Sequence, residues 1–346
     1  MKLFFKNYLS TNTFILLLYF FYSSIEYYQN FFRGTYMLDF MPWMHFTAHQ
    51  AFLGIIGLYL VALIPFYLIE KEKSKALLCV EAVWKKAKNF SYKLSHEEKT
   101  AILAWWVKWF FAPLMIYWMI WHIFSLVSSI GIFALAKPQS TFLELFNTHI
   151  FWISFNTIFF VDVLFFTLWY LVESPYLKNT IKSVEPTILW WVVALCCYPP
   201  FNDYTWTLLW WYSTDFPQFA STYIHLFFNI CILVLMAVYS WASFSLWLKA
   251  SNLTNRGIIT TWPYRYIRHP AYVAKNLAWW IGAFPMILIS MHTQDYRLLS
   301  LVLVSLICWS WIYTLRAFTE EWHLSKDKDY REYKKIVPYR FIPKIW

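Results

Sequence analysis

Glycine is scarce in this chain, and so are charged residues. Only six glycines occur among 346 residues, whereas dinucleotide-binding and phosphate-binding loops need clustered glycines so that the backbone can approach the ligand closely. This scarcity argues against a soluble Rossmann-type enzyme. Charged residues make up 14% of the chain, hydrophobic residues 60% and aromatic residues 23%. This composition is typical of a polytopic membrane protein and not of a soluble domain.

The five cysteines show no C-x-x-C spacing, and all but Cys79 lie in apolar segments. The sequence therefore predicts neither a zinc site nor a disulfide framework. His45 and His49 are four residues apart at the start of a predicted helix, an arrangement that membrane metal enzymes use for their ligands. A di-metal site needs further paired histidines, and the remaining ones occur singly, at His122, His149, His225, His292 and His323 among others. We therefore predict no metal.

Apolar runs long enough to cross a bilayer predict an all-α, polytopic bundle of about eight spanning helices. They begin near Phe14, Phe46, Ala101, Ile150, Thr187, Tyr223, Ala271 and Tyr296. The fifth segment is ambiguous, because Pro199 and Pro200 interrupt it. It either spans the membrane or re-enters on the same side.

The formal net charge of +10 is explained by a membrane and does not require nucleic acid. Of the 27 basic residues in loops and termini, 24 fall on one predicted side, and Arg33, Lys137 and Arg297 fall on the other. By the positive-inside rule, both termini and the 70–100 loop are predicted to be cytoplasmic. The mixed charge and helical periodicity of that loop predict an amphipathic helix at the membrane surface.

Two lysines lie inside apolar segments. Lys108 is expected to pair with Asp162, since an isolated charge in hydrocarbon is costly. Lys275 follows Tyr272 by three residues and shares its helix face. It either extends its amine to the interface or supplies positive charge to an anionic substrate.

The motif RHPAY, residues 268–272, is the most informative stretch. Pro270 fixes its own φ and disfavours the α conformation at His269, so the motif predicts an extended turn followed at once by a helix. Free N–H groups in that first turn and two adjacent basic side chains suit a carboxylate or phosphate.

A second cluster, RAFTEE, follows at residues 316–321. Ionised Glu320 and Glu321 are acceptors for ribose hydroxyls or an amino group. Two alternatives stay open at this point. Both clusters can serve as interfacial anchors of apolar helices, and Arg316 can form an i, i+4 ion pair with Glu320.

These blocks stand in order with two others. The approach PYRYIRHPAY (residues 263–272), an apolar hairpin, RAFTEEWHL (316–324) and the tail YREYKKIVPYRFIP (330–343) resemble the C-terminal half of the isoprenylcysteine carboxyl methyltransferase family. Its members are integral-membrane enzymes that use S-adenosylmethionine. The resemblance covers about residues 253–346.

The resemblance implies roles for particular residues. Arg316 falls where the family contacts the substrate carboxylate, and Lys275 is a further substrate-binding candidate from its place on the helix. The implied cofactor contacts are Tyr264, His269, Pro270, Ala271, Tyr272 and Glu320, with Ile259 and Thr260 as looser candidates. The implied acceptor is lipophilic and enters from the bilayer.

The tail and the RHP-x-Y turn also look like the sterol reductase family, membrane enzymes that use NADPH. Those reductases usually have Asn before the Tyr and an acid soon after it, whereas this chain has Ala271 and Lys275. An NADPH-dependent membrane reductase acting on an isoprenoid lipid is therefore the alternative interpretation of these motifs. We divide the chain into a transmembrane scaffold, residues 1–220, and a methyltransferase-like domain, residues 221–346.

Overall fold

The computed structural model of the protein describes residues 1–38, 41–136 and 141–345. Its regular structure is almost entirely helical, which confirms the predicted fold class. Six helices in the described residues are long and apolar enough to cross a membrane, which indicates a multi-pass membrane protein. They are α3 (Ala48–Ile69), α5 (His96–Leu135), α7 (Phe151–Leu171) with the helical turns that precede it from Phe142, α10 (Thr222–Ser245), α11 (Pro270–His292) and α12 (Tyr296–Leu324).

Shorter elements connect and cover these helices. The remaining helices are α1 (Lys2–Ser24), which is as long as a spanning helix, and the shorter α2 (Glu26–Phe32), α4 (Lys75–Lys88), α6 (Phe142–Leu145), α8 (Ile188–Leu195), α9 (Phe201–Leu209) and α13 (Lys328–Ile336). Two small antiparallel pairs join β1 (Thr35–Leu38) to β2 (Met41–Thr47) and β3 (Ser183–Val184) to β4 (Thr254–Asn255). A π-helical turn, Phe146–Ile150, separates α6 from α7, and single 3-10 turns occur at Pro175–Leu177 and Trp247–Lys249.

The predicted count of eight spanning helices is not confirmed. Helix α1 has 23 residues but carries polar residues such as Asn7, Ser10 and Asn12, and it is not among the six apolar spans. The fifth predicted span is two short helices, α8 of eight residues and α9 of nine. The chain turns between them at Pro199 and Pro200, because proline lacks an N–H and disfavours helix at the preceding residue.

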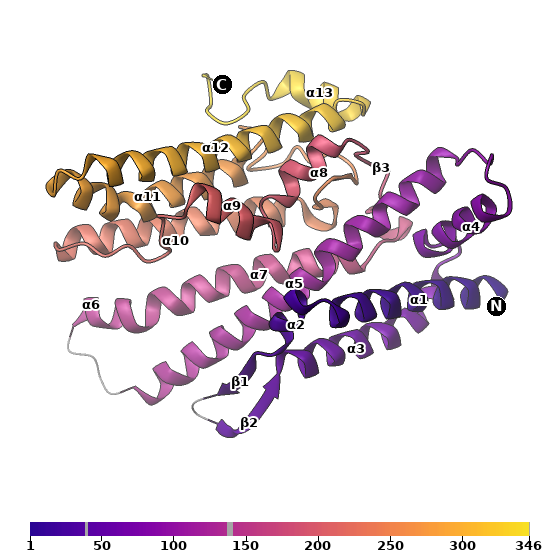
Figure 1. Ribbon diagram of the computed structural model, residues 1–346, viewed down its shortest axis with the longest axis horizontal. Coiled ribbons are helices and arrows are strands. Elements are labelled where there is room, and N and C mark those ends of the chain that lie inside the picture. The colour runs from indigo at the N-terminus through magenta and orange to yellow at the C-terminus, as the bar shows by residue number, and fades with distance from the viewer. Residues whose placement is uncertain (39–40, 137–140, 346) are drawn as a thin grey trace.

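The helices form two groups with α5 and α7 between them (Figure 1). Helices α10, α11 and α12 pack side by side in one group, and α1 and α3 lie in the other. Figure 1 also shows that α8 and α9 follow one another from the end near β3 towards the end where α10 begins. The broken pair therefore advances along the bundle.

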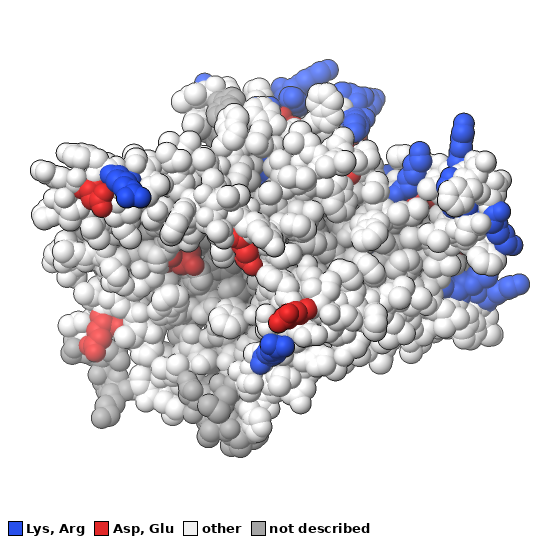
Figure 2. Space-filling view, in the orientation of Figure 1, with Lys and Arg blue, Asp and Glu red and all other residues white. Residues whose placement is uncertain are grey.

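Large apolar side chains on the outside of the bundle suit a lipid environment. Leu58 on α3 is 73% exposed and Val304 on α12 is 56% exposed, and soluble proteins rarely present such faces continuously. Basic residues gather elsewhere. Figure 2 shows most of the visible Lys and Arg at one end of the molecule, over α1, α4 and α13. The rest of this face carries few charged residues. Lys137, counted on the opposite side above, lies outside the described residues.

The surface helix predicted in the 70–100 loop is α4. Ser74 begins it by accepting a hydrogen bond from the Leu77 backbone N–H at 3.1 Å, which satisfies one of the free donors of the first turn. One face is buried at Ala76, Leu77, Cys79 and Ala82, while three lysines lie in its last turn.

Gly282 permits close packing against the spanning helix α11. A Cβ atom added at Gly282 of α11 would lie 2.2 Å from the Thr214 carbonyl oxygen and 2.4 Å from the Ser213 hydroxyl. The segment before α10 therefore lies directly against α11, which only a residue without a side chain permits.

Candidate active site

Helix α11 begins where the sequence predicted. His269 precedes it with φ −128° and ψ 58°, outside the helical region, and Pro270 is its first residue. The C-terminal tail covers this turn, because the backbone N–H groups of Arg268 and His269 donate to the carbonyls of Tyr339 and Arg340 at 3.0 and 3.1 Å. The turn and the tail are therefore one structural unit.

Glu321 is the centre of a buried network that joins these parts. Its carboxylate accepts paired hydrogen bonds from Arg268 (2.9 and 3.3 Å) and from Arg340 (2.9 and 3.0 Å). His269 Nε2 lies 3.0 Å from the same carboxylate. Arg268 also donates to the carbonyls of Val337 and Pro338 at 2.8 and 2.6 Å. Planar guanidinium groups match a carboxylate in this paired geometry.

This network corrects part of the sequence-based assignment. Glu321 is 3% exposed, and its oxygens are engaged by groups of the protein itself. It stabilises the fold and is not available for ribose hydroxyls, in contrast to the expectation that both acids bind ligand. The basic side chain of Arg268 is likewise committed to Glu321 and the tail.

A cavity lies directly beside this network, between α11, α12, the end of α10 and the loop 249–269. It contains about 1100 Å³ of empty space, including its open side. Seven of the eight predicted site residues line it, namely Tyr264, His269, Ala271, Tyr272, Lys275, Arg316 and Glu320. Phe166 and Tyr198 line it as well, so residues before position 221 contribute to the same cavity.

Glu320 is the acid that faces this cavity. Its Oε2 accepts a hydrogen bond from the Tyr272 hydroxyl at 2.9 Å and lies 3.9 Å from His269 Nδ1. Its side chain is 35% exposed, so it keeps oxygen lone pairs for a ligand. The His269 ring stacks on that of Tyr272, with 5.3 Å between the centroids and 10° between the planes. Glu320, His269 and Tyr272 thus form one wall of the cavity.

Arg316 lies deeper and does not pair with Glu320. It is 5% exposed, and its Nη2 donates to Asn252 Oδ1 at 2.9 Å. The guanidinium carbon lies 5.1 Å from the Tyr313 ring centroid and 5.4 Å from that of Tyr272. Its Nε has no hydrogen-bond partner in the described structure. The alternative of an i, i+4 ion pair is therefore wrong, and aromatic faces stabilise the cation instead.

Lys275 is held among aromatic rings. Its amine lies 5.4 Å from the Tyr239 ring centroid, 5.3 Å from that of Trp279 and 5.4 Å from that of Tyr313. Within the described part of the chain, no carboxylate oxygen comes within ion-pair distance of it. Lys275 therefore adds a positive charge to the lining of the cavity.

Of the other predicted contact residues, some line the cavity and others stabilise the structure around it. Tyr264 is 8% exposed, and its carbonyl accepts from the Tyr333 hydroxyl at 2.6 Å. Burial raises the pKa of Tyr264 well above its ordinary value, so this phenol is neutral. Ala271 and Ile259 line the cavity, whereas Pro270 and Thr260 do not. Pro270 is buried in the first turn of α11 and acts by fixing its start.

Among the cavity residues that were not predicted from the sequence, Arg256 and Asn252 have the clearest polar roles. Arg256 is 2% exposed, donates from Nη1 to the Asn179 carbonyl at 3.3 Å, and has no partner for Nε or Nη2 among the described residues. Asn252 links Arg316 to the Tyr170 hydroxyl. Both belong to a polar loop without periodicity. One local feature of the sequence indicated a sharp turn beside Arg256, namely Gly257. This glycine has φ +110°, a conformation that other residues rarely adopt.

The lining is strongly basic. It includes Lys249, Arg256, Lys275 and Arg316, besides Arg268, which is paired with Glu321, and Glu320 is the acid among the residues that line it. A mostly cationic cavity with unpaired guanidinium donors attracts a carboxylate or a phosphate.

Two further sequence expectations are wrong. His45 lies in strand β2 and His49 in helix α3, so they do not share a helix face, and His49 Nε2 bonds to the Tyr19 hydroxyl at 3.0 Å. Lys108 pairs with Glu173 at 2.8 Å and not with Asp162. In the described residues, no group of three or more His, Cys, Asp or Glu side chains is placed to bind a metal ion.

Comparison with known proteins adds no assignment. No protein-family model matches the chain, and no curated protein is significantly similar to it.

Proposed function

We propose that the protein is an integral-membrane methyltransferase that transfers a methyl group from S-adenosylmethionine to a lipophilic acceptor. One observation carries the proposal. Seven residues, which the resemblance and the helix spacing marked in two separate stretches of sequence, 264–275 and 316–320, line a single cavity. Interfacial anchors would extend towards solvent and lipid head groups, whereas Tyr264, His269 and Arg316 are buried and line the cavity.

The residues present suit the chemical parts of S-adenosylmethionine. Its carboxylate matches the unpaired donors of Arg256 and the basic lining. Its ribose hydroxyls match Glu320, an acceptor that receives only one hydrogen bond, from Tyr272. Tyrosine faces around the cavity suit both an adenine ring and a sulfonium cation. When bound, the cofactor supplies a methyl group made electrophilic by the positive sulfur.

Arg316 is the proposed substrate-positioning residue. A carboxylate acceptor is already anionic, so the enzyme has to align and desolvate it and needs no general base. The buried guanidinium keeps its charge and presents an unpaired Nε, whereas an exposed cation would attract the acceptor far less strongly. Lys275, among its three rings, adds positive charge to the same acceptor region.

The acceptor is a lipid or lipidated molecule that enters from the bilayer, and the resemblance suggests a prenylcysteine-type carboxylate. We also propose that both termini and the open side of the cavity are cytoplasmic, where nucleotide-type cofactors occur. The gathering of basic residues at one end supports this orientation (Figure 2).

A second candidate function is an NADPH-dependent reductase acting on an isoprenoid lipid. The basic lining favours it, because the phosphates of NADPH would also match Lys249 and Arg256. The acid at Glu320 disfavours phosphate at that wall by like-charge repulsion. We therefore rank the methyltransferase first.

Binding and turnover measured on two single variants test the proposal. Glu320→Gln removes a charged acceptor and is expected to weaken S-adenosylmethionine binding by about 1.5–3 kcal/mol. Arg316→Ala is expected to leave cofactor binding nearly intact and to abolish methylation of a carboxylate acceptor. Glu332→Gln, on the exposed face of α13, is the control for loss of one negative charge. Equal and small effects of the two site variants on both quantities would remove Arg316 and Glu320 from the site.

A further inference from the structure

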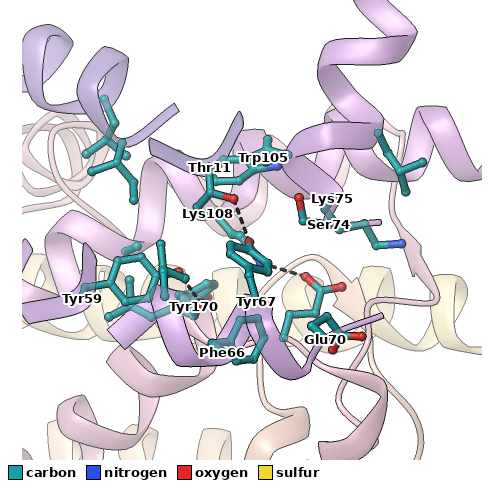
Figure 3. Close-up of a pocket in the computed structure, with 18 of the residues that line it drawn as sticks. Thr11, Tyr59, Phe66, Tyr67, Glu70, Ser74, Lys75, Trp105, Lys108 and Tyr170 are labelled. Atoms are coloured by element: carbon teal, nitrogen blue, oxygen red, sulfur yellow. Dashed lines mark hydrogen bonds and ion pairs between the residues drawn. The ribbon is translucent and has the colours of Figure 1, made fainter. Parts of the chain in front are cut away.

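A second large cavity lies between α1, α3 and α5, in the half of the molecule to which the sequence assigned no chemistry. It contains about 1190 Å³ of empty space, including its open side. Figure 3 shows its residues projecting inward from several helices. One part of the lining is apolar, with Phe52, Ile55, Ile56, Leu63 and Ile116. The other part is polar and includes Glu70, Lys108 and Glu173.

Some of the charges at the polar end are neutralised by ion pairs. Lys108 pairs with Glu173 at 2.8 Å, and Lys73 pairs with Glu81 at 2.8 Å. Glu70 is different. It is 9% exposed and accepts hydrogen bonds from the Ser174 hydroxyl (2.8 Å) and the Glu72 backbone N–H (3.2 Å).

No cationic group lies within ion-pair distance of Glu70 in the described structure. A buried carboxylate that lacks a counter-ion is costly, so this site favours a cation supplied from outside the chain.

Aromatic rings surround the same space. Tyr59, Phe66, Tyr67, Trp105 and Tyr170 all line the cavity (Figure 3). The Tyr67 hydroxyl is bonded to that of Thr11 at 2.7 Å, and the Tyr59 hydroxyl donates to the Leu171 carbonyl at 2.8 Å. With these hydroxyls engaged, the rings offer mainly their faces, which attract ammonium groups.

We propose that this cavity binds a single-chain amphiphile with an ammonium head group, its apolar chain among the aliphatic residues and its nitrogen beside Glu70. An anionic head group fits less well. Glu70, Glu72 and Glu97 line the cavity, whereas Lys75 is the one lysine of the lining without an ion pair in the described residues. The cavity thus selects the opposite charge to the candidate active site.

The two cavities are separate but adjacent. Tyr170 lines the second cavity, and its hydroxyl accepts from Asn252 Nδ2 at 2.9 Å. Asn252 in turn accepts from Arg316 in the candidate active site. The proposed ligand site does not depend on the methyl-transfer reaction, and its test does not use that reaction.

Native mass spectrometry of the full chain, released from a non-ionic detergent, tests the site. The probes are lysophosphatidylcholine and lysophosphatidylglycerol of equal chain length, which share a phosphate and differ in the ammonium group. We expect the bound fraction of lysophosphatidylcholine to exceed that of lysophosphatidylglycerol about tenfold. Free choline, which has the ammonium group without the phosphate or the chain, should not displace the bound lipid.

Two variants of cavity residues test whether the lipid preference arises at this site. Glu70→Gln should remove the preference, and Phe66→Leu should reduce it without loss of a charge, which gives a second test if the first variant folds poorly. Glu332→Gln, remote from the cavity, should retain the preference. Equal retention of the two lipids, a preference for lysophosphatidylglycerol, or a preference that Glu70→Gln and Phe66→Leu both leave unchanged would overturn the proposal.

Discussion

Adjacent acids at the end of α12 are predicted to have opposite roles, and the variant Glu321→Gln tests this most sharply. The Glu321 carboxylate is 3% exposed and receives four hydrogen bonds from the guanidinium groups of Arg268 and Arg340. Its neutralisation leaves Arg268, 6% exposed, as a buried cation without a counter-charge. Breaking a buried ion pair from one side costs about 3–5 kcal/mol. We expect a loss of unfolding free energy of this size.

The matched change one residue earlier should behave differently. Glu320 accepts one hydrogen bond, from Tyr272, and its side chain is 35% exposed. An amide can still accept that bond, so Glu320→Gln should lower the unfolding free energy by less than about 1 kcal/mol. Unfolding of both variants in mixed detergent micelles, followed by tryptophan fluorescence, measures the difference. Similar losses for the two variants would refute the division between a structural and a ligand-facing acid.

Three further predictions follow from other parts of the molecule. Burial alone would raise the pKa of Glu173, but the charges of Lys108 and Arg256 outweigh it and keep the pKa at about 2, against an ordinary 4.5. Because the folded-state pKa is depressed, this stabilisation is complete above pH 4.5 and is lost as the pH falls towards 2, so acid unfolding curves of Glu173→Gln should be flatter in that window. Gly282→Ala should destabilise the protein by about 1–3 kcal/mol in a thermal or chemical unfolding assay, since its Cβ meets backbone, whereas Gly54→Ala, with open space around it, should not. A cysteine placed at position 90 should resist a membrane-impermeant thiol reagent applied from outside and one at position 215 should react, and the reverse pattern would overturn the proposed orientation.

The parts of the fold that sequence predicted depend on local chemistry. Long apolar runs predicted the helices of the bundle, and the restriction that Pro270 places on His269 predicted the turn at the start of α11. The spacing of Tyr272 and Lys275 predicted that they share one helix face, and both line the same cavity.

The parts that sequence missed depend on contacts between distant segments. The partner of Lys108 is Glu173, 65 residues later, which no helix periodicity can indicate. Glu321 receives Arg268 from 53 residues earlier and Arg340 from 19 residues later, so its structural role appears only when the tail is folded over α11. Arg256 enters the cavity from an irregular loop beside the short β3–β4 pair, where no repeating pattern exists.

Equilibrium binding of S-adenosylmethionine and of NADPH to the purified protein, measured side by side by titration calorimetry in detergent, tests the central claim most directly. We predict saturable binding of S-adenosylmethionine that Glu320→Gln weakens and Glu332→Gln does not, with no comparable binding of NADPH. Saturable binding of NADPH without binding of S-adenosylmethionine would contradict the methyltransferase and favour the reductase, and binding of neither would contradict both.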